Sequence, residues 1–315
     1  MSGNHIPVIN VARLDTEETL RNLDSACRNW GAFQVVEHGI DPSVLRAVYR
    51  VMHRFFARPA AEKQAISRSL DNPWGYYDRE LTKNALDWKE IFDYGPADGA
   101  GIAPQWPSGV PGFKEAVTRY YRECEMLAFR LLTAIASNLG LSGSRLANSF
   151  YPRHTSFVRL NYYPQCPDAV APEQAIVPRQ GHMGVNQHTD AGVLTILLQD
   201  SQPGLEVYQN GHWCPVAPYP DALVINLGDI VQVWSNDRYP APLHRVVSDP
   251  QARRYTAPFF FSPAYGTDYQ PLPTTVDRQH PPRYRAINWG EFRRLRAMGD
   301  YADYGEEVQI RHYRV

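Results

Sequence analysis

The 315-residue sequence has few cysteines and almost no net charge, and each shortage argues against a class of protein. Its four cysteines are far apart and include no C-x-x-C pair: Cys27, Cys124, Cys166 and Cys214. So few cysteines in so long a chain do not form a disulfide framework, and they favour a reducing compartment. A net charge of −1 gives no basic surface for nucleic acid or an anionic membrane.

Long apolar runs are also missing, since no stretch approaches the length needed to span a bilayer. The start, MSGNHIPVINVARLD, lacks a basic segment followed by an apolar one, so we expect no secretory signal. We therefore expect a cytoplasmic protein with no nucleic-acid or membrane partner; a monomer is compatible with the sequence, which leaves the oligomeric state open.

The first part of the chain has mainly helical periodicity. Apolar residues from Leu20 to Trp30 form one helical stripe that ends at Gly31. The segment AFQVVEHG is typical of a short strand, and Asp41-Pro42 indicates the start of a second helix. A longer helix is predicted from about Pro111 to Gly140.

After Gly140 the pattern changes to serial short strands separated by Pro, Gly, Asn and Asp. Asn210-Gly211 is a strong hairpin signal, and such a series predicts a sandwich or barrel. A helix is expected again around WGEFRRLRAM, and we interpret its basic group, Arg293, Arg294 and Arg296, as a solvated face. No linker-like composition separates the halves, so the sequence predicts one α+β unit with a mainly β core.

One strand raises a chemical question. NQHTDAGVLTILLQD, residues 186–200, is interpreted as a single buried strand that begins with His188 and Asp190. Residues i and i+2 of a strand point to the same face, so both side chains would reach one metal ion. The pair alone is weak evidence, because His-x-Asp often arises by chance.

A third ligand is available in His244, which opens a later strand in PLHRVVSDP. Two histidines and one carboxylate on one face of a metal, with the other face open, are typical of non-haem Fe(II) oxygenases. The open positions admit oxygen and a bidentate organic acid together. A closed structural zinc site is less favoured, because it needs a fourth ligand.

Arg254 and Thr256 follow in RRYTAPFFF, again two residues apart on a predicted strand. A guanidinium and a hydroxyl on one face make a good clamp for a carboxylate, since arginine pairs with it through two parallel hydrogen bonds. An isolated arginine on an edge strand would be the simpler interpretation if these residues stood alone.

Taken together, the ordered motifs resemble the isopenicillin N synthase-like branch of the iron(II)/2-oxoglutarate-dependent oxygenases. The resemblance covers nearly the whole chain and rests on these segments: IPVINVARL, WGAFQVVEHGI, DWKEIFDYG, RLNYYPQCP, HTDAGVLTILLQD, GLEVYQNGHWCPV, VINLGDIVQVWSNDRYPAPLHRV and RYTAPFFFSP. It implies a double-stranded β-helix (jelly-roll) core with packed N-terminal helices and a C-terminal helix. The expected regions are 1–140, N-terminal and helical, 150–265, the jelly-roll core, and 266–315, the C-terminal helix and tail, in one integrated unit.

The resemblance also implies roles for particular residues. It matches His188, Asp190 and His244 to the iron ligands. It matches Arg254, Thr256, Asn161 and Tyr163 to the 2-oxoglutarate site, with threonine in place of the family's usual serine. Arg159 and Phe260 are assigned to the substrate pocket, because strand alternation puts them on the same faces as the cosubstrate residues. An inward phenylalanine can also be simple core.

The implied activity is an Fe(II)- and 2-oxoglutarate-dependent oxygenase that uses O2, with ascorbate as a helpful addition. It would convert 2-oxoglutarate to succinate and carbon dioxide while it hydroxylates, desaturates or cyclises a small molecule at an unactivated C–H bond. A specialised metabolite or an amino acid derivative would fit, and the sequence does not identify which.

Two alternatives stay open at this point. The first is a four-electron oxidase of the isopenicillin N synthase type, which keeps the triad and does not use 2-oxoglutarate. The second is a non-catalytic ligand-binding barrel, although a pure binder needs neither triad nor clamp. The segment 168–187 is interpreted as a loop at the pocket mouth, either a lid over substrate or an insertion without a role.

Overall fold

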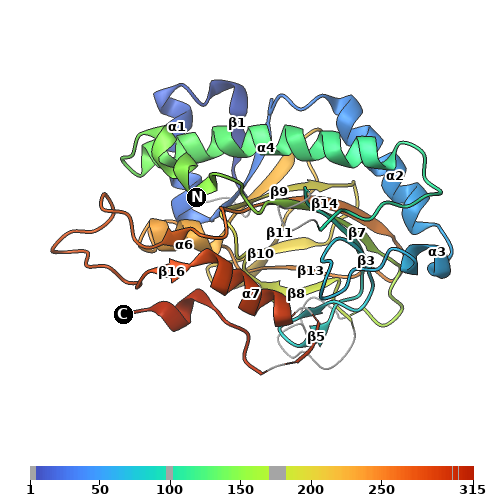
Figure 1. Cartoon of the computed structure of the whole chain (residues 1–315). Coiled ribbons are helices and arrows are strands. Elements are labelled where there is room, and N and C mark those ends of the chain that lie inside the picture. The colour runs from blue at the N-terminus through green and yellow to red at the C-terminus, as the bar shows by residue number, and fades with distance from the viewer. Residues whose placement is uncertain (1–4, 97–101, 170–181, 300, 304) are drawn as a thin grey trace.

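At the centre of the molecule, two β-sheets face each other (Figure 1). The computed structural model describes residues 5–96, 102–169, 182–299, 301–303 and 305–315. The large sheet has eight strands, in the order β1 (Val8–Asn10), β2 (Ala32–Val36), β12 (Leu223–Leu227), β9 (Leu194–Gln199), β14 (Arg254–Phe261), β7 (Phe157–Tyr163), β6 (Glu90–Tyr94) and β3 (Gly75–Tyr77). The small sheet has four, in the order β11 (His212–Pro215), β10 (Leu205–Gln209), β13 (His244–Val246) and β8 (Val185–His188). Two short pairs lie outside these sheets: β4 (Leu81–Thr82) with β5 (Ala85–Leu86), and β15 (Asp268–Tyr269) with β16 (Ile287–Asn288).

The inner faces of the two sheets share a small apolar core. Tyr163 and Leu197 from the large sheet pack with Val207 and Val246 from the small sheet. This pairing of sheets, with the strand order above, is the jelly-roll expected from the sequence.

Helices cover the outer face of the large sheet. The described ranges contain α1 (Glu17–Asn29), α2 (Pro42–Phe56), α3 (Ala60–Gln64), α4 (Phe113–Asn138), α5 (Gly143–Ala147), α6 (Asp229–Trp234) and α7 (Trp289–Gly299). α4 runs across the large sheet and contacts β7, β9 and β14, with α1 and α2 packed against it (Figure 1). The predicted start of α2 is confirmed: Asp41 accepts a hydrogen bond from the backbone of Ser43, and Pro42 is the first helical residue.

The N-terminal region also supplies strands to the large sheet. β1 and β2 pair side by side and extend it beyond β12, whereas β6 and β3 extend it beyond β7. Of these four strands, only β2 was predicted from the sequence. Residues 8–94 are therefore joined to the core by sheet hydrogen bonds at both edges.

The single strand expected over residues 186–200 is wrong. The segment forms two strands, β8 in the small sheet and β9 in the large sheet, joined by a turn. Glycines make this crossing possible: a Cβ on Gly228 would lie 2.1 Å from the carbonyl oxygen of Gly192, and one on Gly192 would lie 2.7 Å from Ser262 Oγ. Strand alternation carries no signal for such a change of sheet.

None of the helices within the described ranges is both long and apolar enough to cross a bilayer.

Candidate metal and cosubstrate site

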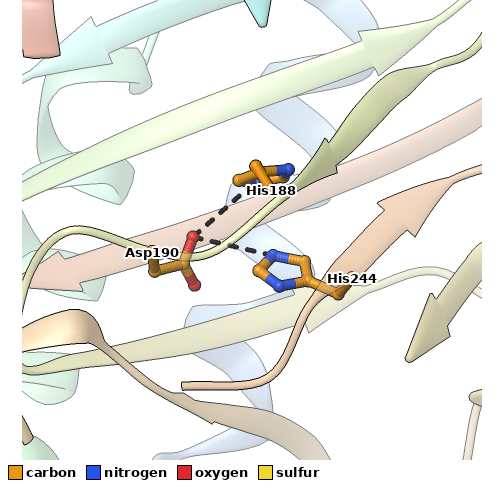
Figure 2. A group of neighbouring side chains, drawn as sticks. All are labelled: His188, Asp190 and His244. Atoms are coloured by element: carbon orange, nitrogen blue, oxygen red, sulfur yellow. Dashed lines mark ion pairs between the residues drawn. The ribbon is translucent and has the colours of Figure 1, made fainter. Parts of the chain in front are cut away.

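Three side chains meet where β8 and β13 lie side by side (Figure 2). His188 is the last residue of β8, and it pairs in register with His244, the first residue of β13. Their ring centroids are 4.3 Å apart. Asp190 lies two residues beyond β8, in the turn to β9, so its carboxylate is aimed at the imidazoles by the turn and not by strand alternation.

The atoms that could bind a metal converge. The Nε2 atoms of His188 and His244 each lie 3.6 Å from Oδ1 of Asp190. One potential ligand atom from each residue lies within 4.8 Å of the other two. Since transition metals bind nitrogen and oxygen at about 2.0–2.2 Å, small side-chain adjustments suffice for one ion to contact all three.

Backbone hydrogen bonds fix the orientation of both imidazoles. Nδ1 of His188 is 2.8 Å from the carbonyl oxygen of Asn186, and Nδ1 of His244 is 3.0 Å from that of Pro242. A carbonyl only accepts, so Nδ1 carries the proton in each ring. The lone pair is left on Nε2, the atom that faces Asp190.

Hydrogen bonds also orient the carboxylate. Oδ2 of Asp190 accepts a hydrogen bond from Thr195 Oγ1 at 2.6 Å and a long one from Asn226 Nδ2 at 3.5 Å. Oδ1 is therefore the oxygen that faces the two imidazoles.

The protonation states suit metal binding. Burial, together with the neighbouring imidazole of His244, lowers the pKa of His188 to about 3, so this ring is neutral at pH 7. Burial alone would raise the pKa of Asp190, but His244, His188 and the two hydrogen bonds hold it below its usual value. A neutral imidazole and an ionised carboxylate are the forms that bind a divalent ion.

The predicted clamp lies on the paired strands β7 and β14. Arg254 pairs in register with Tyr163, and Thr256 pairs with Asn161. Nε of Arg254 donates to the carbonyl of Gln202 at 3.3 Å, and its Nη2 donates to Gln199 Oε1 at 3.0 Å. Arg254 is 4% exposed, and its Nη1 has no hydrogen-bond partner among the described residues.

Asn161, like Arg254, has one polar atom held by the protein and one without a partner among the described residues. Its Nδ2 donates to Thr256 Oγ1 at 3.0 Å, while its Oδ1 finds no partner within the described part of the chain. A buried guanidinium nitrogen without an acceptor is costly, and an anionic oxygen would relieve that cost at Arg254. The residues present therefore fit the distal carboxylate of 2-oxoglutarate, with the Thr256 hydroxyl beside it.

Triad and clamp line one cavity. The same cavity is lined by both residues predicted for the substrate, Arg159 and Phe260. Phe260 stacks on Phe157, with ring centroids 4.7 Å apart. Arg159, in contrast, has its charge matched: it donates to Asp93 at 2.7 and 2.9 Å and to Glu80 at 2.6 and 2.8 Å.

Arg159 belongs to a buried ion-pair cluster that the sequence analysis missed. Its members are Arg68, Glu80, Asp87, Lys89, Asp93 and Arg159. Their side chains are at most 13% exposed. Positive and negative charges are equal in number, and Asp87 also accepts from the backbone of Asn186 at 3.0 Å, next to the metal triad. The partners are up to 79 residues apart in sequence, so no local signal identifies the cluster.

The interpretation of the late basic group as a solvated face is wrong for two of its three arginines. Arg294 is exposed, but Arg293 and Arg296 are partly buried and line the cavity. Arg296 donates to the carbonyl of Thr189 at 3.1 Å and pairs with Glu307 at 3.1 Å. The cavity therefore has a wall made by α7 and the C-terminal tail, because the helix packs against the turn between β8 and β9.

The hypothesised lid, residues 168–187, falls mostly outside the described residues, since 170–181 are not described. Described residues on either side of this gap contact each other: the backbone N–H of His182 donates to the carbonyl oxygen of Asp168 at 2.9 Å. The imidazole of His182 stacks on Trp88, with ring centroids 4.8 Å apart.

This chain is similar to known proteins over most of its length. The model of the 2OG-Fe(II) oxygenase superfamily matches residues 154–263, and that of the non-haem dioxygenase in morphine synthesis N-terminal region matches residues 6–109. Jasmonate-induced oxygenase 2 of Arabidopsis thaliana is 32% identical, over 93% of this chain and 79% of the relative. Flavanone 3-dioxygenase 2 of Oryza sativa subsp. japonica is 33% identical, over 93% of this chain and 83% of the relative.

Solved structures agree in fold. The crystal structure of JOX2 in complex with 2OG, Fe and JA has a TM-score of 0.85 at 30% identity, covering 99% of this chain and 89% of that chain. The crystal structure of the dioxygenase for auxin oxidation in rice has a TM-score of 0.76 at 27% identity, covering 99% of this chain and 100% of that chain.

Proposed function

Because this chain belongs to the 2OG-Fe(II) oxygenase superfamily, we propose that His188, Asp190 and His244 hold its catalytic iron and that Arg254 anchors its cosubstrate. The chain is an Fe(II)- and 2-oxoglutarate-dependent oxygenase that acts on a small organic molecule. The observation that carries the residue assignment is the convergence of the two Nε2 atoms on Asp190 Oδ1. The same cavity holds a buried guanidinium whose Nη1 has no partner among the described residues.

When bound, iron supplies the redox chemistry by which one O2 and one 2-oxoglutarate give succinate, carbon dioxide and one oxygen atom for the substrate. The protein positions the participants. Asn186 and Pro242 carbonyls keep Nε2 of both imidazoles unprotonated, and Thr195 turns one oxygen of Asp190 away from the imidazoles. Arg254, Thr256 and Asn161 would hold the far carboxylate of 2-oxoglutarate, which would leave its keto-acid end for the triad.

The cavity walls around the triad contain both apolar and charge-matched side chains. Leu197, Leu205, Val185 and Val246 line the same cavity as the clamp and pack with Tyr163 in one apolar cluster. Exclusion of water there strengthens the pairing of Arg254 with a carboxylate. It also keeps the reacting C–H bond of the substrate away from bulk solvent.

We place the chain within the isopenicillin N synthase-like branch of the superfamily, as a proposal supported by the match of residues 6–109 to a non-haem dioxygenase N-terminal model. We likewise propose the regional division 1–140, 150–265 and 266–315, supported by model matches that fall within the first two of these regions. A role in specialised metabolism is supported by the similarity to a flavanone dioxygenase.

We also propose that the protein acts in the cytoplasm, without nucleic-acid or membrane partners. The net charge of −1 supports the absence of a nucleic-acid or anionic-membrane surface. The four cysteines are free, and three of them are buried, which suits a reducing compartment.

The test of the cosubstrate assignment is oxygen uptake by the Fe(II)-loaded protein with and without 2-oxoglutarate. We expect uptake only with 2-oxoglutarate, with one succinate formed for each 2-oxoglutarate consumed. Uptake that is equally fast without it would favour the alternative, an oxidase of the isopenicillin N synthase type.

A further inference from the structure

The cavity lining contains more positive than negative side chains. Its cations are Lys89, Arg159, Arg254, Arg293 and Arg296, and its carboxylates are Glu80, Asp190 and Glu307. An iron(II) ion and the 2-oxoglutarate dianion would cancel each other, so they leave this excess unchanged. Which cations lack a partner therefore depends on the carboxylates that each one contacts.

Three of the five cations have protein carboxylates as partners. Lys89 lies 2.9 Å from Asp87 and 3.2 Å from Glu80. Arg159 is bound by Glu80 and Asp93, and Arg296 by Glu307 and two backbone carbonyls. Arg254 is the fourth, and it is committed to the cosubstrate in the function proposed above.

Arg293 is the remaining cation. No hydrogen bond or ion pair joins it to another residue in the described ranges, although it is partly buried and lines the cavity. Its guanidinium carbon lies 4.7 Å from the ring centroid of Phe157 and 6.0 Å from that of Trp289. A guanidinium held over an aromatic face keeps its in-plane N–H groups available, which are the donors that bind a carboxylate.

The two unmatched guanidiniums lie at opposite ends of β7. Arg254 is over the ring of Tyr163, the last residue of the strand, and Arg293 is over Phe157, the first. The inward row of β7 runs Phe157, Arg159, Asn161, Tyr163 and spans about 20 Å at roughly 3.3 Å per residue. One five-carbon cosubstrate cannot reach both ends, so 2-oxoglutarate at Arg254 leaves Arg293 without an anionic partner.

We propose that the primary substrate is a monocarboxylic acid whose carboxylate binds Arg293 and whose apolar body packs on Phe157 and Phe260. This inference rests on the proposed function, since it assigns Arg254 to 2-oxoglutarate. A single guanidinium fits one carboxylate, and the stacked phenylalanine rings beside it offer an apolar surface. Arg293 would then fix which C–H bond of the substrate faces the metal.

The test measures binding of benzoate, cinnamate, octanoate and dodecanoate, each beside its uncharged primary amide. The protein is loaded with Fe(II) and 2-oxoglutarate under nitrogen, and binding is followed by calorimetry. Arg293→Gln is compared with wild type, with Arg293→Lys as the charge-retaining variant. Arg294→Gln is the matched control, because Arg294 is the exposed neighbour on the same helix.

We expect wild type and Arg294→Gln to bind at least one acid about tenfold or more tightly than its amide. Arg293→Gln should lose this preference, and Arg293→Lys should keep part of it. If no acid binds better than its amide, whether or not anything binds, or if the preference survives in Arg293→Gln, the proposal is overturned.

Each sample is first titrated with Fe(II) and 2-oxoglutarate, so that failure of the proposed function can be distinguished from failure of the role assigned to Arg293. A wild-type protein that binds neither contradicts the proposed function itself. A protein that binds both and shows no acid preference contradicts only the role of Arg293.

Discussion

At the scale of single residues, the site combines satisfied and unsatisfied polar groups. The imidazoles and the carboxylate of the triad each have one atom held by a hydrogen bond of 3.0 Å or less and one atom that faces the other two side chains. Arg254 repeats this arrangement, with two nitrogens bound to Gln199 and Gln202 and the third free among the described residues. Such a residue is pre-positioned for its ligand, because it loses little conformational freedom on binding.

Replacement of Arg254 by leucine should therefore weaken 2-oxoglutarate binding and leave metal binding nearly intact. Loss of one half of a desolvated charge pair typically costs about 2–5 kcal/mol, which corresponds to a rise in the dissociation constant of roughly thirtyfold or more. The measurement is a 2-oxoglutarate titration of the Fe(II)-loaded protein. Arg253→Leu is the matched control, since Arg253 is the exposed neighbour; equal affinities in the two variants would count against the clamp.

At the scale of elements, the crossing between the two sheets sets the geometry of the triad. Asp190 lies in the turn from β8 to β9, and that turn packs against the start of α6. The backbone N–H of Asp229 donates to the carbonyl of Asp190 at 2.7 Å. Neither Gly228 nor Gly192 has room for a side chain, because a Cβ would meet the carbonyl of Gly192 at the first position and Ser262 and Phe261 at the second.

Gly228→Ala should disturb the metal site without touching any ligand side chain. Its Cβ would lie 2.1 Å from the carbonyl oxygen of Gly192 and 3.1 Å from that of Asp190, so the turn must shift. We expect iron affinity to fall about 10- to 100-fold, as for loss of an outer-sphere support. Gly266→Ala is the control, because nothing lies within 4 Å of its Cβ position; an unchanged iron affinity in Gly228→Ala would contradict this view of the turn.

The ion-pair cluster joins β6 and β7 beside the cavity, and it should contribute to stability. Glu80 has a side chain that is 4% exposed and contacts Arg159 and Lys89, so Glu80→Ala leaves the buried cluster with one unmatched positive charge. We expect the free energy of unfolding to fall by about 3–5 kcal/mol, measured by urea denaturation. Glu62→Ala, which removes an exposed pair with Arg58, should cost less than about 1 kcal/mol. A comparable loss in both variants would refute this role.

The sequence predicted those features that depend on local patterns or on ordered motifs. The capping of α2 at Asp41-Pro42 and the span of α4 follow from periodicity and termination signals. The approach of His244 to His188 was expected from the family resemblance. Residues 186–200 were misjudged because an apolar run does not reveal which sheet it joins, and Arg293 was misjudged because a charge run does not reveal which members face a cavity.

At the scale of the whole molecule, the two sheets, the covering helices and the C-terminal helix act together as a support for one cavity. α4 and α2 back the large sheet, which carries the clamp, while the small sheet carries both histidines (Figure 1). α7 and the tail cover the cavity from another side through Arg296. The proposed metal, cosubstrate and substrate positions thus lie on different elements and come together only in the folded chain.

The central claim is that His188, Asp190 and His244 hold one iron ion. The most direct measurement is the iron content of the protein after anaerobic reconstitution with Fe(II) and removal of excess metal. Wild type and His212→Ala, which changes an exposed histidine on β11, should retain about one iron per chain. Asp190→Ala and His244→Ala should retain almost none, because two remaining ligands hold Fe(II) too weakly. Wild-type iron content in either of these two variants would contradict the account.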